Sequence, residues 1–184
     1  MLKVTIPSSE LFDETTQTFV YTKEQTLSME HSLVSLSKWE AKWNKPFLSD
    51  KERSIEETLD YFRCMTITQD VDPDIYKYMP PVIIEQIEAY IKAPMTATTF
   101  YEDKIEGKSK GSSKEIITSE LIYYWMIANN IPMECQKWHL NRLLTLIRVC
   151  SIKNAPPKKT GKRELASRYA ALNAARRKKF NTTG

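Results

Sequence analysis

The chain has 184 residues, of which 41% are hydrophobic, enough for one domain with a sizeable core and an appendage. Only four glycines are present, which disfavours nucleotide-binding loops and β-rich folds with many tight turns. The longest apolar run, 121–128, is too short to span a membrane, and no apolar leader follows Lys3. Three cysteines at scattered spacings fit a reduced, cytoplasmic setting.

Charge is divided unevenly along the chain. Residues 153–184 hold ten Lys/Arg and one acid, a net +9, whereas residues 1–152 hold 17 basic and 22 acidic residues, a net −5; together they give the formal +4. The sequence therefore predicts a mildly acidic globular body that carries a strongly basic C-terminal arm.

Residues 1–31 are predicted to form a small antiparallel sheet packed on the body. Residues 2–6 alternate between apolar and polar, and Pro7 ends this strand. Residues 10–22 are typical of a strand, a turn and a second strand, and 26–30 could add a third.

Two helices are predicted next. The first covers 32–44 and ends before Pro46. The second begins after Ser54, which forms a capping box with Glu57 three residues later. Their expected apolar stripes are Leu33, Leu36, Trp39, Ala41 and Trp43 on the first helix, and Ile55, Leu59, Phe62 and Met65 on the second.

The middle of the chain is punctuated by prolines. Residues 72–74 predict a short helical turn, and Pro80-Pro81 begins a helix over 82–92 that Ala93-Pro94 ends. Its inward side chains are expected to be Ile83, Ile84, Ile87 and Ile91. Residues 104–114 contain two glycines and four lysines, and we expect a mobile loop or hairpin tip there.

Two further helices are predicted to form an αα-hairpin at the heart of a helical body, 32–152. The first spans 115–130, with Ser113 or Thr118 as its cap. Its centre, 121–128, is apolar all round, so it is buried on most sides or buried on one and used for binding on another. The second helix, 133–152, is amphipathic.

The arm, 153–184, starts with a linker over 154–161, and 163–179 is predicted to be a helix. Its apolar stripe is thin (Leu165, Tyr169 and Leu172), so we expect it to order on a protein partner or in an oligomer. Its basic end, 176–179, can be interpreted as a solvated tail, as a dock for an acidic protein, or as a non-specific nucleic-acid contact. The predicted fold class is thus mainly α, with a small N-terminal antiparallel sheet, an αα-hairpin and a basic helical arm.

No catalytic site, metal or cofactor is expected. Cys135 and His139 stand four apart on one predicted helix, but a zinc site needs at least three ligands and the only other histidine is His31. A buried thiol and a surface or capped histidine explain the pair. Acidic pairs such as Glu56-Glu57 occupy helix starts, where the dipole favours them. No recognised nucleophile signature is present, so we predict a protein that is not an enzyme.

Aromatic clusters are usually core, but adjacent aromatic residues cannot all point inward, and an outward one can anchor a partner. The residues considered for partner binding are the aromatic Trp39, Trp43, Tyr123, Tyr124, Trp125 and Trp138 and the basic Arg176, Arg177, Lys178 and Lys179.

Three stretches resemble the tail assembly chaperones of tailed bacteriophages. They are LVSLSKWEAKWNKPFL at 33–48, ITSELIYYWMI at 117–127 and CQKWHLNRLLTLIRVC at 135–150, joined by the basic ending AARRKK at 174–179. The resemblance covers most of the chain, and its motifs have no catalytic meaning.

The resemblance implies a non-enzymatic protein that coats the tape-measure protein in the host cytoplasm and keeps it soluble until tail-tube protein polymerises around it. The implied partners are the tape-measure protein and the tube protein, with several copies or a homo-oligomer on the partner and no membrane. Two alternatives stay open: a virion structural component of the tail or head–tail region, and a nucleic-acid-binding protein acting through the arm.

Overall fold

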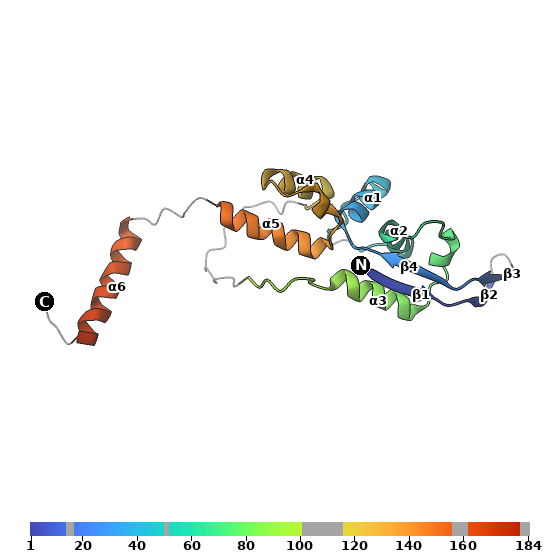
Figure 1. Ribbon diagram of the computed structural model, residues 1–184, viewed down its shortest axis with the longest axis horizontal. Coiled ribbons are helices and arrows are strands. Elements are labelled where there is room, and N and C mark those ends of the chain that lie inside the picture. Colours follow the sequence, from blue (N-terminus) through green and yellow to red (C-terminus); the bar gives the residue numbers. More distant parts are fainter. Residues whose placement is uncertain (14–16, 50–51, 101–115, 156–161, 181–184) are drawn as a thin grey trace. The chain divides into compact units, whose positions relative to one another are not determined.

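The computed structural model describes residues 1–13, 17–49, 52–100, 116–155 and 162–180 (Figure 1). It divides into two compact units, Met1–Ile152 and Lys153–Gly184. The predicted mainly α fold with a small antiparallel sheet at the N-terminus is confirmed. In chain order the elements are β1 (Leu2–Ile6), β2 (Ser9–Asp13), β3 (Thr18–Thr22), β4 (Gln25–Met29), α1 (Leu33–Trp43), α2 (Ile55–Met65), η1 (Pro73–Tyr76), α3 (Pro81–Lys92), α4 (Ser119–Ala128), η2 (Met133–Lys137), α5 (Leu140–Asn154) and α6 (Lys162–Phe180).

The four strands form an antiparallel ribbon in two segments, each a separate two-stranded sheet. β1 pairs with β4 from Leu2↔Met29 to Ile6↔Gln25, and β2 pairs with β3 from Ser9↔Thr22 to Asp13↔Thr18. The register is the same in both segments, although residues 7–8 and 23–24 between them belong to no strand. Pro7 has no backbone N–H to donate, which accounts for the end of β1. The expected third strand is β4. In the first segment Val4, Ile6, Leu27 and Met29 are buried, and α3 packs beside β1.

Both ends of α1 are fixed by side chains or backbone geometry that the sequence supplies. Ser32 and Ser35 form a capping box at its start, and Asn44 ends it in the left-handed region at φ 50°. α1 packs against α2 and α4, and it buries Leu33, Leu36 and Trp39.

The capping box of Ser54 and Glu57 at the start of α2 is confirmed. The expected inward position of Ile55 was wrong, because this side chain is 81% exposed. Glu57 occupies the buried position of the first turn instead, and its side chain turns back to the cap. The core stripe of α2 is completed by Tyr61, Phe62 and Met65.

The proline-bounded elements follow the prediction. Asp72 caps η1 by accepting a hydrogen bond from the Asp74 backbone N–H at 2.9 Å. α3 begins at Pro81 and ends at Lys92, with Ala93 as its C-cap and Ile87 fully buried. The predicted loop at 104–114 lies outside the described residues.

The region after α3 departs from the prediction in two ways. Thr118 caps α4, which therefore begins at Ser119 rather than at residue 115. The predicted continuous helix over 133–152 is two elements, η2 and α5. Between them His139 forms an antiparallel bridge with Ser32, and the next backbone N–H, of Leu140, donates to the His31 carbonyl at 2.7 Å. This bridge to the start of α1 requires non-helical backbone, so Cys135 and His139 do not share a helix.

One hydrophobic core joins β1, β4, α1, α2, α3, α4 and α5, and its largest fully buried side chains include Trp39, Tyr61 and Phe62. The second unit contains α6, whose predicted helical state is confirmed. Where its side chains are described, at 166–167 and 169–180, they are exposed. Across the described residues, no helix combines the length and the apolar character that crossing a membrane requires.

Candidate partner-binding surface

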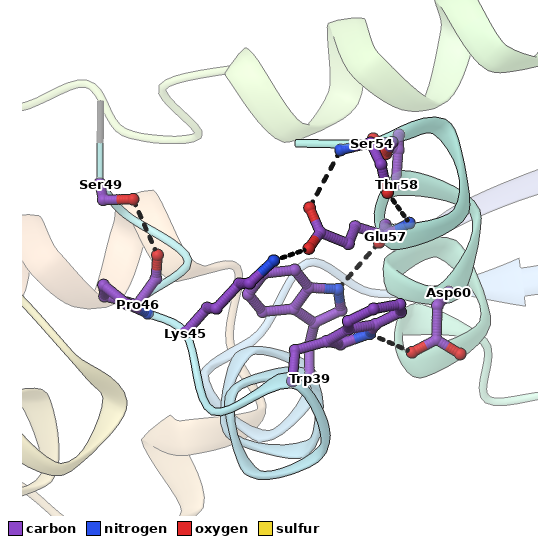
Figure 2. Close-up of polar contacts among 9 residues, drawn as sticks. Trp39, Lys45, Pro46, Ser49, Ser54, Glu57, Thr58 and Asp60 are labelled. Carbon is purple, nitrogen blue, oxygen red and sulfur yellow. Dashed lines mark hydrogen bonds and ion pairs between the residues drawn. The ribbon is translucent and has the colours of Figure 1, made fainter. Parts of the chain in front are cut away.

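The two tryptophans of α1 hold the junction between α1 and α2. Trp39 is 1% exposed, and its indole Nε1–H donates to the Glu57 carbonyl at 2.8 Å (Figure 2). Trp43 is half-buried, stacks on Trp39 at 6.2 Å, and donates to Asp60 Oδ2 at 2.9 Å. Trp39 was predicted as a partner-binding residue, but a partner cannot reach its side chain in the folded body. The N–H edge of the Trp43 ring is already hydrogen-bonded to Asp60 of α2.

A carboxylate in α2 connects this junction to the loop that follows α1. Lys45 pairs with the Glu57 carboxylate, whose other oxygen accepts from the Ser54 backbone N–H at 3.0 Å (Figure 2). The hydrogen bond from Lys45, followed by that from the Ser54 backbone, lowers the pKa of Glu57. The loop from Lys45 onward is therefore held against the start of α2.

A second carboxylate positions α4. Glu40 is buried in α1, where its Oε1 accepts from the Phe47 N–H at 2.8 Å and its Oε2 accepts from the Ser119 N–H at 2.7 Å. Ser119 is the first residue of α4, where backbone N–H groups have no partner inside the helix. Glu40 thus fixes the N-terminus of α4 against α1.

With its start fixed, α4 has a buried and an outer face. Ser119, Ile122 and Met126 point into the body. On the outer face Tyr124 is 63% exposed and Ile127 is 67% exposed. They are three residues apart, so they neighbour each other on the helix surface. The sequence left open whether this helix is buried on most sides or on one side only, and the structure shows one buried face and one exposed face.

The neighbouring aromatic residues are partly covered. Tyr123 is half-buried, donates its hydroxyl to Gln136 Oε1 at 2.9 Å, and has its pKa raised by burial. Trp125 is half-buried against the core. Trp138, after η2, lies under the Arg142 guanidinium at 4.3 Å from the ring centroid, so a cation already covers one ring face.

The basic candidates are exposed at the C-terminal end of α6, which is described by itself. Arg177, Lys178 and Lys179 lie in its last turn, where the negative end of the helix dipole favours cations, and Arg176 directly precedes them. Of the aromatic candidates, Tyr123, Tyr124 and Trp125 lie on α4. The two tryptophans of α1, Trp39 and Trp43, pack instead at the junction between α1 and α2.

Sequence reasoning missed several exposed apolar residues. Ile127 was inside the apolar run 121–128, and its spacing from Tyr124 was the available signal. Phe12, Phe19 and Tyr21 are 53%, 58% and 71% exposed on the second segment of the ribbon, where Phe12 and Phe19 pair edge to face at 5.2 Å. In the first segment, alternate residues such as Val4 and Leu27 point to one face of the ribbon and are buried in the core. Phe12, Phe19 and Tyr21 continue the same alternation in the second segment, where they are exposed.

The described part of the chain contains a polar hollow and free cysteines. Within it, no group of three or more His, Cys, Asp or Glu side chains is placed to hold a metal ion. A hollow of about 410 Å³ beside the ribbon is lined by polar residues such as Tyr21, Glu24 and Asp72 together with Ile75. Cys135 is buried, and Cys64 and Cys150 are half-buried free thiols.

Comparison of the chain with protein-family models, with curated proteins and with solved structures gives no match.

Proposed function

We propose that this protein is a non-enzymatic tail morphogenesis protein of a bacteriophage, a chaperone that coats the tape-measure protein in the host cytoplasm and assists tail-tube assembly. The proposal starts from the resemblance at 33–48, 117–127 and 135–150. A tape-measure protein exposes apolar helix before the tube surrounds it, so it needs a transient apolar cover.

The outer face of α4 is the observation that carries the proposal. Tyr124 and Ile127 present apolar surface one helical turn apart, and the helix beneath them is anchored by Ile122, Met126 and the Glu40 carboxylate. Helices pack by inserting such side chains between those of a partner helix. A rigid helix with an apolar outer face suits a helical client, and several copies along a long client would use the same face repeatedly.

Co-expression with the tape-measure protein tests this function. We expect the wild-type chain to raise the soluble yield of the tape-measure protein and the double substitution Tyr124→Ser with Ile127→Ser to lose most of that gain. Ile55→Ser is the matched control, because Ile55 is an exposed isoleucine on another helix. Equal solubility with and without the wild-type chain would refute the function, and equal loss in both variants would refute the surface.

A second candidate, nucleic-acid binding, is favoured by the exposed cations at 176–179. Phosphate contacts through this segment would be non-specific and would weaken steeply with salt. A variant lacking 153–184 separates the candidates. A chaperone acting through α4 keeps affinity for the tape-measure protein without the arm, whereas a nucleic-acid binder loses its binding and its salt dependence.

A structural role in the virion is the remaining alternative. Mass spectrometry of purified particles separates it from a chaperone role, because a chaperone leaves before the tail is complete. Stoichiometric amounts of the chain in mature particles would favour the structural role.

A further inference from the structure

The only two histidines of the chain lie together in the interior of the body. His31 precedes α1 and is 2% exposed, and His139 precedes α5 and is 6% exposed. Their ring centroids are 5.1 Å apart at an interplanar angle of 68°. An imidazole is the side chain whose charge ordinarily changes near neutral pH, so a buried pair is chemically unusual in a core.

The hydrogen bonds of His139 require a neutral ring. Its Nδ1 lies 3.3 Å from the Asn141 backbone N–H, which can only donate, so Nδ1 must accept. Its Nε2 lies 3.0 Å from the Tyr90 carbonyl oxygen, which can only accept, so Nε2 must carry the hydrogen. A second proton could be placed only on Nδ1, where it would face the Asn141 N–H.

His31 is enclosed from another side. Its Nδ1 and the hydroxyl of Tyr61, in α2, share a hydrogen bond of 2.6 Å. Burial, followed by the proximity of His139, lowers the pKa of His31 to about 3. Burial also lowers the pKa of His139, and the hydrogen bond to the Tyr90 carbonyl opposes that change.

The two histidine rings lie where the segment between β4 and α1, the helix α3 and the start of α5 come into contact. The His31 carbonyl accepts from the Leu140 N–H at the start of α5, and the Tyr90 ring of α3 packs edge to face on His139 at 4.9 Å. Asn141 extends the connection to the end of α3, because its Nδ2 donates to the Ile91 and Ala93 carbonyls at 3.1 and 2.8 Å.

Few charges are placed to compensate a proton on the pair. Among the described residues, Glu30 at the end of β4, the Met1 ammonium before β1, Tyr61 of α2 and Tyr90 of α3 are the titratable groups that face it. The Glu30 carboxylate raises the pKa of His139 and the Met1 ammonium lowers it. Both Glu30 oxygens are already engaged, one by the Tyr90 hydroxyl at 2.6 Å and the other by the Met1 ammonium at 2.7 Å.

We propose that His31 and His139 form an acid-sensitive latch, which holds α3 and α5 on the β4–α1 junction while both rings are neutral and releases them when acid protonates the pair. Protonation of His139 places a donor against the Asn141 N–H, and protonation of both rings places two like charges in a buried site with ring centroids 5.1 Å apart. The latch does not depend on the proposed function.

Nuclear magnetic resonance of the full chain tests the latch through its two histidine signals and its amide exchange. While the body is folded, we expect the His31 ring not to titrate between pH 8 and 5.5, and the pKa of His139 to lie below the ordinary histidine value because the ring is buried. Between pH 7 and 5, after correction for intrinsic exchange, protection of the Leu140 and Asn141 amides should fall by at least about 25-fold, the factor for one ring with an ordinary histidine pKa of about 6.5 in the opened state. Protonation of the second ring should increase this factor further. The Asn44 amide, bonded to Glu40 at the end of α1, should lose less.

Variants separate a latch from general acid sensitivity. The double substitution His31→Asn with His139→Asn cannot be protonated, and Asn at 139 can still accept from the Asn141 N–H, so the pH dependence of Leu140 protection should disappear. Tyr61→Phe keeps both histidine rings, so this variant should retain the pH dependence of Leu140 protection. The wild-type profile decides the matter even if the double variant does not fold. A ring that titrates near pH 6.5 in the folded body, or Leu140 and Asn44 losing protection in equal measure, would overturn the latch.

Discussion

α4 and α6 are both helices with exposed aromatic or aliphatic side chains, yet they differ in what holds them. α4 buries Ile122 and Met126 and has its first turn fixed by Glu40. α6 exposes Tyr169 at 59% and Leu172 at 48%, and its described side chains are exposed throughout. An exposed apolar side chain on a helix that is packed into a core is preorganised for binding, whereas ordering a side chain on a helix whose described side chains are all exposed costs conformational entropy when a partner binds.

The largest expected effect comes from the core at the junction between α1 and α2. Trp39→Ala removes a fully buried ring and the hydrogen bond to the Glu57 carbonyl. We expect the free energy of unfolding of the body to fall by about 3–5 kcal/mol. Urea denaturation followed by fluorescence of the remaining tryptophans measures this. A loss below about 1 kcal/mol would mean that Trp39 is not part of the core.

Glu40 should rank next. Glu40→Ala leaves the buried N–H groups of Phe47 and Ser119 without their acceptor, at a cost of about 1–3 kcal/mol each before relaxation or entry of water. The matched substitution Glu40→Gln keeps one acceptor oxygen and should lose about half as much. Hydrogen exchange at Ser119 should increase in both variants, and unchanged exchange there would contradict the anchoring of α4.

The pH dependence of stability should come next. The folded-state pKa of His31 is about 3, below its ordinary 6.5, because burial disfavours the charged ring. Below pH 6.5 the unfolded chain binds the extra proton, so stability is complete above that pH and is lost as the pH falls toward 3. At pH 5 the expected loss is about 2 kcal/mol. Urea midpoints at pH 7 and 5 measure it; equal midpoints would contradict the burial of a neutral His31.

A smaller effect is expected at the start of α2. Ser54→Ala removes the acceptor of the Glu57 N–H in the capping box and should cost about 1 kcal/mol. Ser54→Asp is the matched control, since aspartate also caps well. Thermal unfolding distinguishes the two, and identical losses in both variants would mean that the cap contributes nothing.

The smallest effects should fall on the outer face of α4 and on α6. Tyr124→Ser and Leu172→Ser each remove a side chain that is largely exposed, so the stability of the body should change by no more than about 0.5 kcal/mol. The two variants should differ in their affinity for the partner, with a large loss of affinity only for Tyr124→Ser. Equal losses of binding would contradict the assignment of the partner-binding surface to α4 and not to α6.

Local sequence signals predicted most of the elements because their causes are local. The capping box of Ser54, the proline starts of η1 and α3, and the basic helix of the arm all depend on neighbours within a few residues. The break at His139 could not be predicted, because it comes from a bridge to Ser32 on a distant segment. Helical periodicity alone favours a continuous helix there.

The candidate surface was predicted only in part. Aromatic clustering marked Tyr124 correctly as a residue that could point outward, but it also marked Trp39, whose burial depends on the packing of α1 against α2. Ile127 was missed because an apolar run does not by itself reveal which side lies inward. That direction is fixed by tertiary contacts such as the one from Glu40 to Ser119.

The central claim, that the outer face of α4 contacts the client, is tested most directly by site-specific photocrosslinking. A photoreactive amino acid replaces Tyr124 in one variant and Ile55, exposed on α2, in the other, and each is co-expressed with the tape-measure protein. We predict a crosslink to the tape-measure protein from position 124 and little from position 55. Crosslinking from position 55 alone, or from neither position while the proteins still co-purify, would contradict the claim.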